Sequence, residues 1–206
     1  MLLKRPATLH LQEGLFVPEG IALDEVDGRW EQHCLQNPAC FDGTLLHVLG
    51  AHRNGCGGAI VHVMRCSYRF FGVQTDSYDV GIRPLGVKGI THFKSNVLWG
   101  KRSNAVRHYA GQWEYAPAGS VEPGTSPEAT IESELLEETG LTLVSRPIAI
   151  AMLFDEVAKT WELIYRLQAS SSTIACNSEY LACRWLEQNA IPEAVTPVSR
   201  LMMPYA

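Results

Sequence analysis

Short runs of apolar and β-branched residues, separated by turn-forming residues, recur along most of the chain and predict strands rather than long helices. Most of these runs are bounded by Gly, Asn, Asp or Ser, which commonly end strands. Strands are expected at residues 44–51, 59–64, 85–93, 96–101, 113–116, 148–154, 161–167 and 180–186. The pattern therefore indicates a mixed fold, α/β or α+β, in which strands outnumber helices.

Helices are expected in only a few segments. Residues 24–36 predict a short helix that ends before the Asn-Pro pair at 37–38, because the residue before a proline disfavours helical backbone. Another helix is expected after the Thr-Pro pair at 196–197. Between two strands, the glycine-rich residues 53–58 predict a hairpin turn. Their spacing differs from G-x-G-x-x-G, so they do not indicate a phosphate-binding loop.

The strongest chemical signal is an acidic segment that has no Lys or Arg. Its five carboxylates are Glu128, Glu132, Glu134, Glu137 and Glu138. A surface helix normally mixes charges so that neighbouring turns attract, whereas these side chains repel one another. Glu134, Glu137 and Glu138 stand at positions i, i+3 and i+4, so they share one helical face and suit a hard divalent cation such as Mg²⁺. A solvated acidic face is the alternative interpretation.

Residues on either side define this acidic helix. Ser126 is a good N-cap, Pro127 suits the first helical position, and Glu128 favours the positive end of the helix. Gly140 suits a C-cap. The sequence thus predicts a loop, a short acidic helix and a second loop.

Residues 119–141 resemble the Nudix box, Gx5Ex7REUxEExGU, in which U is an aliphatic residue. The positions that match it in register are Gly119, Glu134, Leu135, Glu137, Glu138, Gly140 and Leu141. Two positions depart from it, because Thr125 stands where the box has Glu and Ser133 stands where it has Arg. The resemblance implies that the absent pair would brace the metal ligands. Losing both partners together leaves no unpaired charge.

The resemblance also implies a fold and a division of the chain. It implies an α/β/α sandwich for residues 80–206, the Nudix hydrolase domain. Residues 1–79 are then an N-terminal β-rich extension, called the extension below.

Nudix enzymes cut a diphosphate linked to another moiety by attack of water, so the resemblance implies a metal-dependent pyrophosphatase. It implies that Glu134, Glu137 and Glu138 bind Mg²⁺ or Mn²⁺ together with a carbonyl near Gly119. The expected catalytic residues are Glu134, Glu138 and Glu179. Glu179 is included because Glu-x5-Trp resembles a downstream segment that supplies a fourth carboxylate in some members. Glu156 and Glu162, which flank an expected turn, are further candidates for the general base. For Glu156, Glu162 and Glu179 the alternative interpretation is an exposed loop carboxylate without a catalytic role.

A finer resemblance favours a substrate. The order of Trp30, residues 37–38, 41–42, 68–71 and 83–87 looks like the Nudix subgroup of UDP-glucose pyrophosphatases. A UDP-glucose-like nucleotide sugar is therefore the favoured substrate, with ADP-ribose or a dinucleotide as the alternative. The two departures from the box favour a different class, a nucleotide-binding module with little turnover. A structural domain without a ligand is disfavoured, because the acidic face lowers stability unless a cation relieves it.

Phosphate binding also requires cations from the protein. Those near the strands that lead to the box are Arg83, Lys101, Arg102 and Arg107. Arg83 and Arg102 are the expected substrate ligands, because arginine binds phosphate oxygens bidentately. The aromatic residues available to stack a base, most of them expected in the core, are Tyr68, Phe70, Phe71, Trp99, Trp113 and Tyr115.

The composition and charge of the chain argue against some classes of binding partner. The 206 residues are 46% hydrophobic and 19% charged, with net charge −5 and no basic stripe, which argues against nucleic-acid binding. No apolar run is long enough for a membrane span, and no signal peptide is expected. Six cysteines without a C-x-x-C pair predict reduced thiols in a cytoplasmic protein, and a zinc site at Cys34, Cys40, His33 and His47 has poor spacing. The expected partner is a small nucleoside diphosphate compound, and a homodimer is left open.

Overall fold

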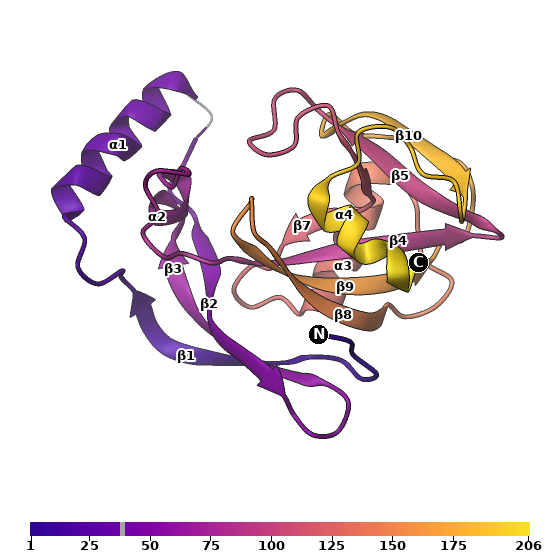
Figure 1. Ribbon diagram of the computed structural model, residues 1–206, viewed down its shortest axis with the longest axis horizontal. Coiled ribbons are helices and arrows are strands. Elements are labelled where there is room, and N and C mark those ends of the chain that lie inside the picture. Colours follow the sequence, from indigo (N-terminus) through magenta and orange to yellow (C-terminus); the bar gives the residue numbers. More distant parts are fainter. Residues whose placement is uncertain (38–39) are drawn as a thin grey trace.

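The computed structural model describes residues 1–37 and 40–206, and their strands form two sheets (Figure 1). The elements in chain order are β1 (Thr8–Phe16), α1 (Leu23–Gln36), β2 (Thr44–Arg53), β3 (Ala59–Ser67), α2 (Tyr68–Gly72), β4 (Leu85–Phe93), β5 (Asn96–Arg102), β6 (Trp113–Tyr115), β7 (Ala118–Ser120), α3 (Pro127–Thr139), β8 (Ile148–Asp155), β9 (Thr160–Gln168), β10 (Tyr180–Glu187), α4 (Pro197–Met202) and the 3-10 helix η1 (Met203–Tyr205).

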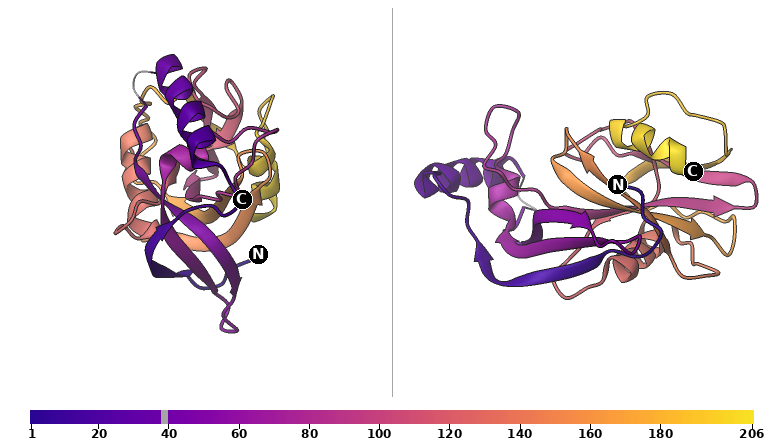
Figure 2. Two further views of the ribbon diagram at one scale, coloured as in Figure 1. Left: turned by 90° about the vertical axis from the view of Figure 1, so that its left-hand side faces the viewer. Right: turned by 60° about the horizontal axis from the view of Figure 1, so that its bottom comes forward.

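The larger sheet has seven strands and follows the order β10-β5-β4-β9-β8, with β6 paired to β5 and β7 paired to β4. Strands β4 and β9 are parallel, and the other pairs are antiparallel. Helix α3 contacts β4 and β7, while α4 contacts β6 and β8. Figure 2 shows these two helices on opposite faces of the sheet. The predicted α/β/α sandwich is therefore confirmed.

Local signals define α3 as the sequence predicts. The Oγ atom of Ser126 accepts a hydrogen bond from the backbone N–H of Ala129 at 3.2 Å. Gly140 has φ of 69°, a left-handed conformation that ends the helix at little cost for glycine. The apolar side chains of Ile131 and Leu135 are fully buried against the sheet. The carboxylate-bearing face is thereby turned toward β7 and β10.

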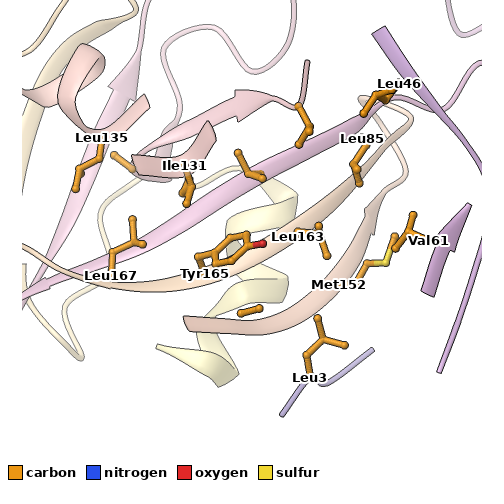
Figure 3. Packing of buried hydrophobic residues seen from close by; sticks show 14 of the residues in the cluster. Leu3, Leu46, Val61, Leu85, Ile131, Leu135, Met152, Leu163, Tyr165 and Leu167 are labelled. Atoms are coloured by element: carbon orange, nitrogen blue, oxygen red, sulfur yellow. The ribbon is translucent and has the colours of Figure 1, made fainter. Parts of the chain in front are cut away.

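The extension forms the smaller sheet, in the order β1-β3-β2. Its inner side chains, including Leu46 and Val61, belong to the same buried cluster as Leu85 and Leu163 of the larger sheet (Figure 3). A second cluster lies under α1 and α2. Its buried members are Val26, Leu45, Cys66, Phe70, Val73, Val80 and Ile82. The extension thus shares a core with the sandwich, and the division at residue 79 stays an interpretation.

The first residues of the chain also join the larger sheet. The backbone N–H of Leu3 donates to the carbonyl of Ile150 at 2.8 Å, and that of Met152 donates to Met1 at 2.8 Å. None of the helices within the described residues has the length and apolar character needed to cross a membrane.

Every strand and helix expected from the sequence is present, with ends that shift by up to a few residues. The structure adds β1, α2 and β7, which the sequence pattern did not reveal. Strand β1 is mostly exposed, so its apolar positions show little alternation. Helix α2 and strand β7 are too short to establish a period. The predicted stop of α1 before residues 37–38 falls partly outside the described residues, and α1 itself ends at Gln36.

The cysteine prediction was wrong for one pair. Cys176 and Cys183 form a disulfide with their Cα atoms 6.3 Å apart, because the loop before β10 turns back along that strand. Cys34, Cys40, Cys56 and Cys66 are free.

His47 is part of the structure rather than of a zinc site. It is buried, and its Nδ1 atom accepts a hydrogen bond from the backbone N–H of Arg83 at 2.9 Å. Burial, aided by the charge of Arg83, lowers the pKa of His47 to about 4, so the imidazole is neutral.

Candidate active site

The most deeply buried carboxylate of the acidic helix is Glu138, whose side chain is 2% exposed. It accepts hydrogen bonds from the backbone N–H of Ala118 at 3.1 Å and from the Tyr180 hydroxyl at 3.0 Å. Burial raises the pKa of Glu138 well above its usual value, and Glu114, Glu134 and, less strongly, Glu179 raise it further. Strands β7 and β10 therefore fix this carboxyl group between two donors.

Glu134 lies one turn earlier and packs directly on Gly119. A Cβ atom added to Gly119 would lie 2.0 Å from Oε1 of Glu134, so only glycine allows this approach. Burial raises the pKa of Glu134 to about 7, with further contributions from Glu179, Glu137 and Glu122. Because Glu179 acts on both Glu134 and Glu138, the structure brings this distant residue into the carboxylate group.

The third box carboxylate, Glu137, is exposed and differently held. The Oγ atom of Ser133 donates a hydrogen bond to Oε1 of Glu137 at 2.6 Å. Thr125 is also exposed, and its backbone N–H donates to the carbonyl of Glu122 at 3.1 Å. Both departures from the box thus replace charged side chains by small hydroxyls.

Carboxylate oxygens have the right chemistry for a hard divalent cation. Across residues 1–37 and 40–206, however, no three His, Cys, Asp or Glu side chains are arranged so that they could hold one metal ion as placed. Binding of one cation by Glu134, Glu137 and Glu138 therefore requires that some of these side chains change their conformation.

A polar cavity of about 250 Å³ adjoins these carboxylates. Its lining includes Ala118, Gly119 and Glu179 on the side of the acidic helix and Lys88 and Arg102 from neighbouring strands. Further along, it reaches residues of β9 and of the loop after β5. The cavity thus places carboxylates and cations around one space.

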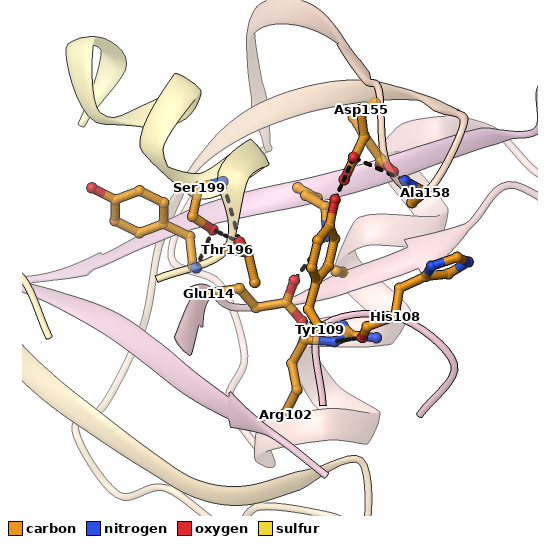
Figure 4. A network of polar contacts seen from close by, with 12 residues as sticks. Arg102, His108, Tyr109, Glu114, Asp155, Ala158, Thr196 and Ser199 are labelled. Carbon is orange, nitrogen blue, oxygen red and sulfur yellow. Dashed lines mark hydrogen bonds and ion pairs between the residues drawn. The ribbon is translucent and has the colours of Figure 1, made fainter. Parts of the chain in front are cut away.

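The two cations share one buried partner, Glu114, whose side chain is fully buried. The Nζ atom of Lys88 lies 2.9 Å from Oε2 of Glu114, and Arg102 donates to the other oxygen (Figure 4). Burial opposes the charge of Glu114, but Lys88 and Arg102 offset this and hold its pKa below the usual value. Lys88 and Arg102 therefore give this part of the cavity cationic donors for an anionic ligand, while Asp155, Glu162 and Glu179 line other parts of it.

Glu162 is a second buried carboxyl group near these cations and also lines the cavity. It accepts a hydrogen bond from the Thr160 hydroxyl at 2.6 Å. Burial raises the pKa of Glu162, although Lys88 acts in the opposite direction. Glu162 is therefore not the exposed loop residue that the sequence suggested as one alternative.

Other predicted residues lie elsewhere. Arg83 donates to both carboxylate oxygens of Asp79, at 2.8 and 2.6 Å, and is not among the residues that line the polar cavity. Glu156 is exposed and lies 3.8 Å from the amine of Lys159. Arg107 donates to the backbone carbonyl of Phe71 at 3.0 Å. Arg102 is thus the predicted cation that the structure places at the cavity.

Sequence reasoning missed several groups at this site, namely Lys88, Tyr109, Glu114, Asp155 and Tyr180. Lys88 interrupts an apolar strand and Glu114 stands between two aromatic residues, so each is a charge where burial is expected. Tyr109 donates its hydroxyl proton to Asp155 at the rim of the cavity, as Figure 4 shows. Nothing in the sequence pattern pairs these residues.

Comparison with known proteins identifies the family. The NUDIX domain model matches residues 83–206, more than half of the chain, so the chain belongs to the Nudix family. It is a Nudix-type pyrophosphatase, a hydrolase that acts on nucleotide-linked phosphoric anhydrides.

Solved structures of Nudix proteins have a similar fold. A MutT Nudix hydrolase from Burkholderia pseudomallei is 21% identical with a TM-score of 0.52, over 58% of this chain and 95% of that one. A MutT protein from Methanosarcina mazei Go1 is 23% identical with a TM-score of 0.51, over 59% and 90%. At these identities the likeness shows the fold alone.

Proposed function

We propose that the protein hydrolyses a nucleoside diphosphate sugar, with UDP-glucose-like compounds favoured, by attack of water within the diphosphate. The observation that carries this proposal is the polar cavity, which Glu179, Lys88 and Arg102 line together. Glu134 and Glu138 lie directly behind its lining residues Gly119 and Ala118. A diphosphate is an anion that matches the cations, and the carboxylates can hold metal and water beside it.

The carboxylate group also supports a role for Mg²⁺ or Mn²⁺. Burial and mutual repulsion raise the pKa values of Glu134 and Glu138, and a bound cation would relieve both effects. Glu134, Glu137 and Glu138 would hold it, with a backbone carbonyl near Gly119. When bound, the cation neutralises phosphate oxygens and favours attack by water.

The chain's own residues have separate roles in this proposal. Lys88 and Arg102 bind the diphosphate oxygens, and Glu114 keeps both side chains charged and in place. Glu134 is the preferred base, because its carboxyl group packs on Gly119 at the lining of the cavity. Glu179 is the alternative base. The role of Arg83 as a substrate ligand stays a prediction, as do a homodimer and a cytoplasmic location.

The preference for a UDP-glucose-like compound rests on the resemblance of short segments in the extension and of residues 83–87, which follow it. ADP-ribose or a dinucleotide is the alternative substrate of the same chemistry. A nucleotide-binding module with little turnover is the second candidate function. It is favoured by the two departures from the box, Thr125 and Ser133, and by the hydrogen bond that Ser133 donates to Glu137 in place of an arginine.

A panel of nucleoside diphosphate compounds with Mg²⁺ or Mn²⁺, read by phosphate release after phosphatase coupling, tests the proposal. Hydrolysis of UDP-glucose to UMP and glucose 1-phosphate is the expected result. Turnover confined to ADP-ribose or dinucleotides would select the alternative substrate. Binding in calorimetry without cleavage of any compound would refute the enzyme and leave the binding module.

A further inference from the structure

A second cavity, of about 360 Å³, lies where the extension meets the loop after β7. It shares four lining residues with the polar cavity, namely Phe71, Pro84, Ser120 and Thr160. The two cavities therefore adjoin each other. We call the second one the extension cavity, because α1, α2, β2 and residues 37, 40, 41 and 43 contribute most of its lining.

Aromatic rings form one wall of the extension cavity. The Tyr68 ring meets the rings of Trp30 and Phe71 edge-on, each with centroids 6.0 Å apart. Phe41 is 77% exposed, yet its ring lies over Gly43, where an added Cβ atom would be 3.0 Å away from it. Tyr68 is thus held in place before any ligand arrives, and Phe41 offers a large apolar surface at the same opening.

Polar groups and the acidic segment form the rest of the lining. Val121 and Glu122 come from the loop that leads to α3, and His33 and Thr44 come from the extension. Glu122 also influences the pKa of Glu134, so this wall lies near the carboxylate group. An aromatic wall with a few polar groups is typical of a cavity that binds a flat, amphipathic ligand.

We propose that the extension cavity binds the nucleoside half of the substrate while the diphosphate occupies the polar cavity. The inference rests on the proposed function and assigns the recognition of the base to the extension, outside the residues that match the family model. A base stacks on aromatic rings, whereas a hexose, which is covered with hydroxyl groups, requires many hydrogen-bond partners. Phe41 and Tyr68 are the residues that this proposal makes specificity-determining.

The test compares UDP-glucose with a base-free analogue in which glucose is joined through a diphosphate to a methyl group. The variants of the full chain are Phe41→Ala and Tyr68→Leu. Leu35→Ala is the matched control, because Leu35 is an exposed apolar residue of the extension, 74% exposed, outside the cavity lining. Both variants should raise KM for UDP-glucose on the order of tenfold and leave KM for the base-free analogue unchanged. The control Leu35→Ala should leave both KM values unchanged.

Direct binding separates this proposal from the proposed function. Calorimetry with uridine, and with adenosine as the second probe, needs no turnover. Uridine or adenosine binding that weakens in Phe41→Ala supports the cavity even if no compound is cleaved. Hydrolysis of UDP-glucose with an unchanged KM in both variants would overturn the nucleoside site and leave the hydrolase. Absence of both cleavage and nucleoside binding would overturn both.

Discussion

Substitution of Gly119 by alanine is expected to abolish most activity while leaving the fold intact. The new Cβ atom would lie 2.0 Å from Oε1, 2.3 Å from Cδ and 2.5 Å from Cγ of Glu134. Carbon and oxygen atoms in contact need roughly 3.5 Å, so the carboxyl group must move by about 1.5 Å. A displacement of this size at a reacting group costs on the order of a hundredfold in kcat.

Stability should change little in this variant. Gly119 is not among the glycines with positive φ, so its backbone conformation is open to alanine. The atoms that must move form the end of a flexible side chain that is only half buried. Loss of glycine from a strand also reduces the entropy of the unfolded chain, which stabilises by roughly 0.4–1 kcal/mol and offsets part of any strain.

The assay measures kcat on the substrate found by the panel, together with a thermal melt. Gly50→Ala is the matched control, because Gly50 also lies in a strand and an added Cβ atom would meet nothing within 4 Å. The reasoning is refuted if Gly119→Ala keeps its activity within about threefold of wild type with an unchanged melt. In that case the position of Glu134 does not matter for the reaction.

Three further predictions concern the charged groups. A hundredfold excess of Mg²⁺ or Mn²⁺ over its Kd should stabilise the protein by about 2.7 kcal/mol in thermal melts, and Glu138→Gln should shrink this gain; equal gains in both proteins would contradict a site at Glu138. The folded pKa of Glu134, about 7, lies above its usual 4.5, so its contribution to metal-free stability should fall as pH rises through this window. His47, whose pKa is lowered, makes stability rise with pH in both proteins, so the difference in unfolding free energy between wild type and Glu134→Gln isolates the contribution of Glu134. Parallel pH profiles of the two proteins would argue against a raised pKa of Glu134. Glu114→Gln should cost about 3 kcal/mol in urea unfolding, because it leaves the buried Lys88 and the partly buried Arg102 without their carboxylate. A cost below about 0.5 kcal/mol, as expected for an ordinary surface change, would mean that the pair is not needed for stability.

The acidic helix shows how far local sequence signals reach. Ser126, Pro127 and Gly140 define its ends because each residue acts on the backbone within a few positions. The spacing of Glu134, Glu137 and Glu138 likewise follows from the helical repeat. The family and the sandwich could therefore be predicted from a single segment.

Strand register decided what that segment faces. Tyr180 pairs with Arg102 across β10 and β5, which brings the neighbouring Glu179 close to the box carboxylates. Lys88 pairs with Ala118, whose N–H donates to Glu138. These contacts join residues far apart in the chain, and no local preference specifies them.

By itself, then, the sequence determined the elements with strong periodicity, the capped acidic helix and the carboxylates that one turn of helix aligns. Tertiary structure alone decided the pairing of Lys88 and Arg102 with the buried Glu114, the disulfide of Cys176 with Cys183, and the placement of Tyr68 in the extension cavity. The physical reason is range. Backbone preferences act over a few residues, whereas a binding site forms where packing of distant segments brings buried charges and rings together.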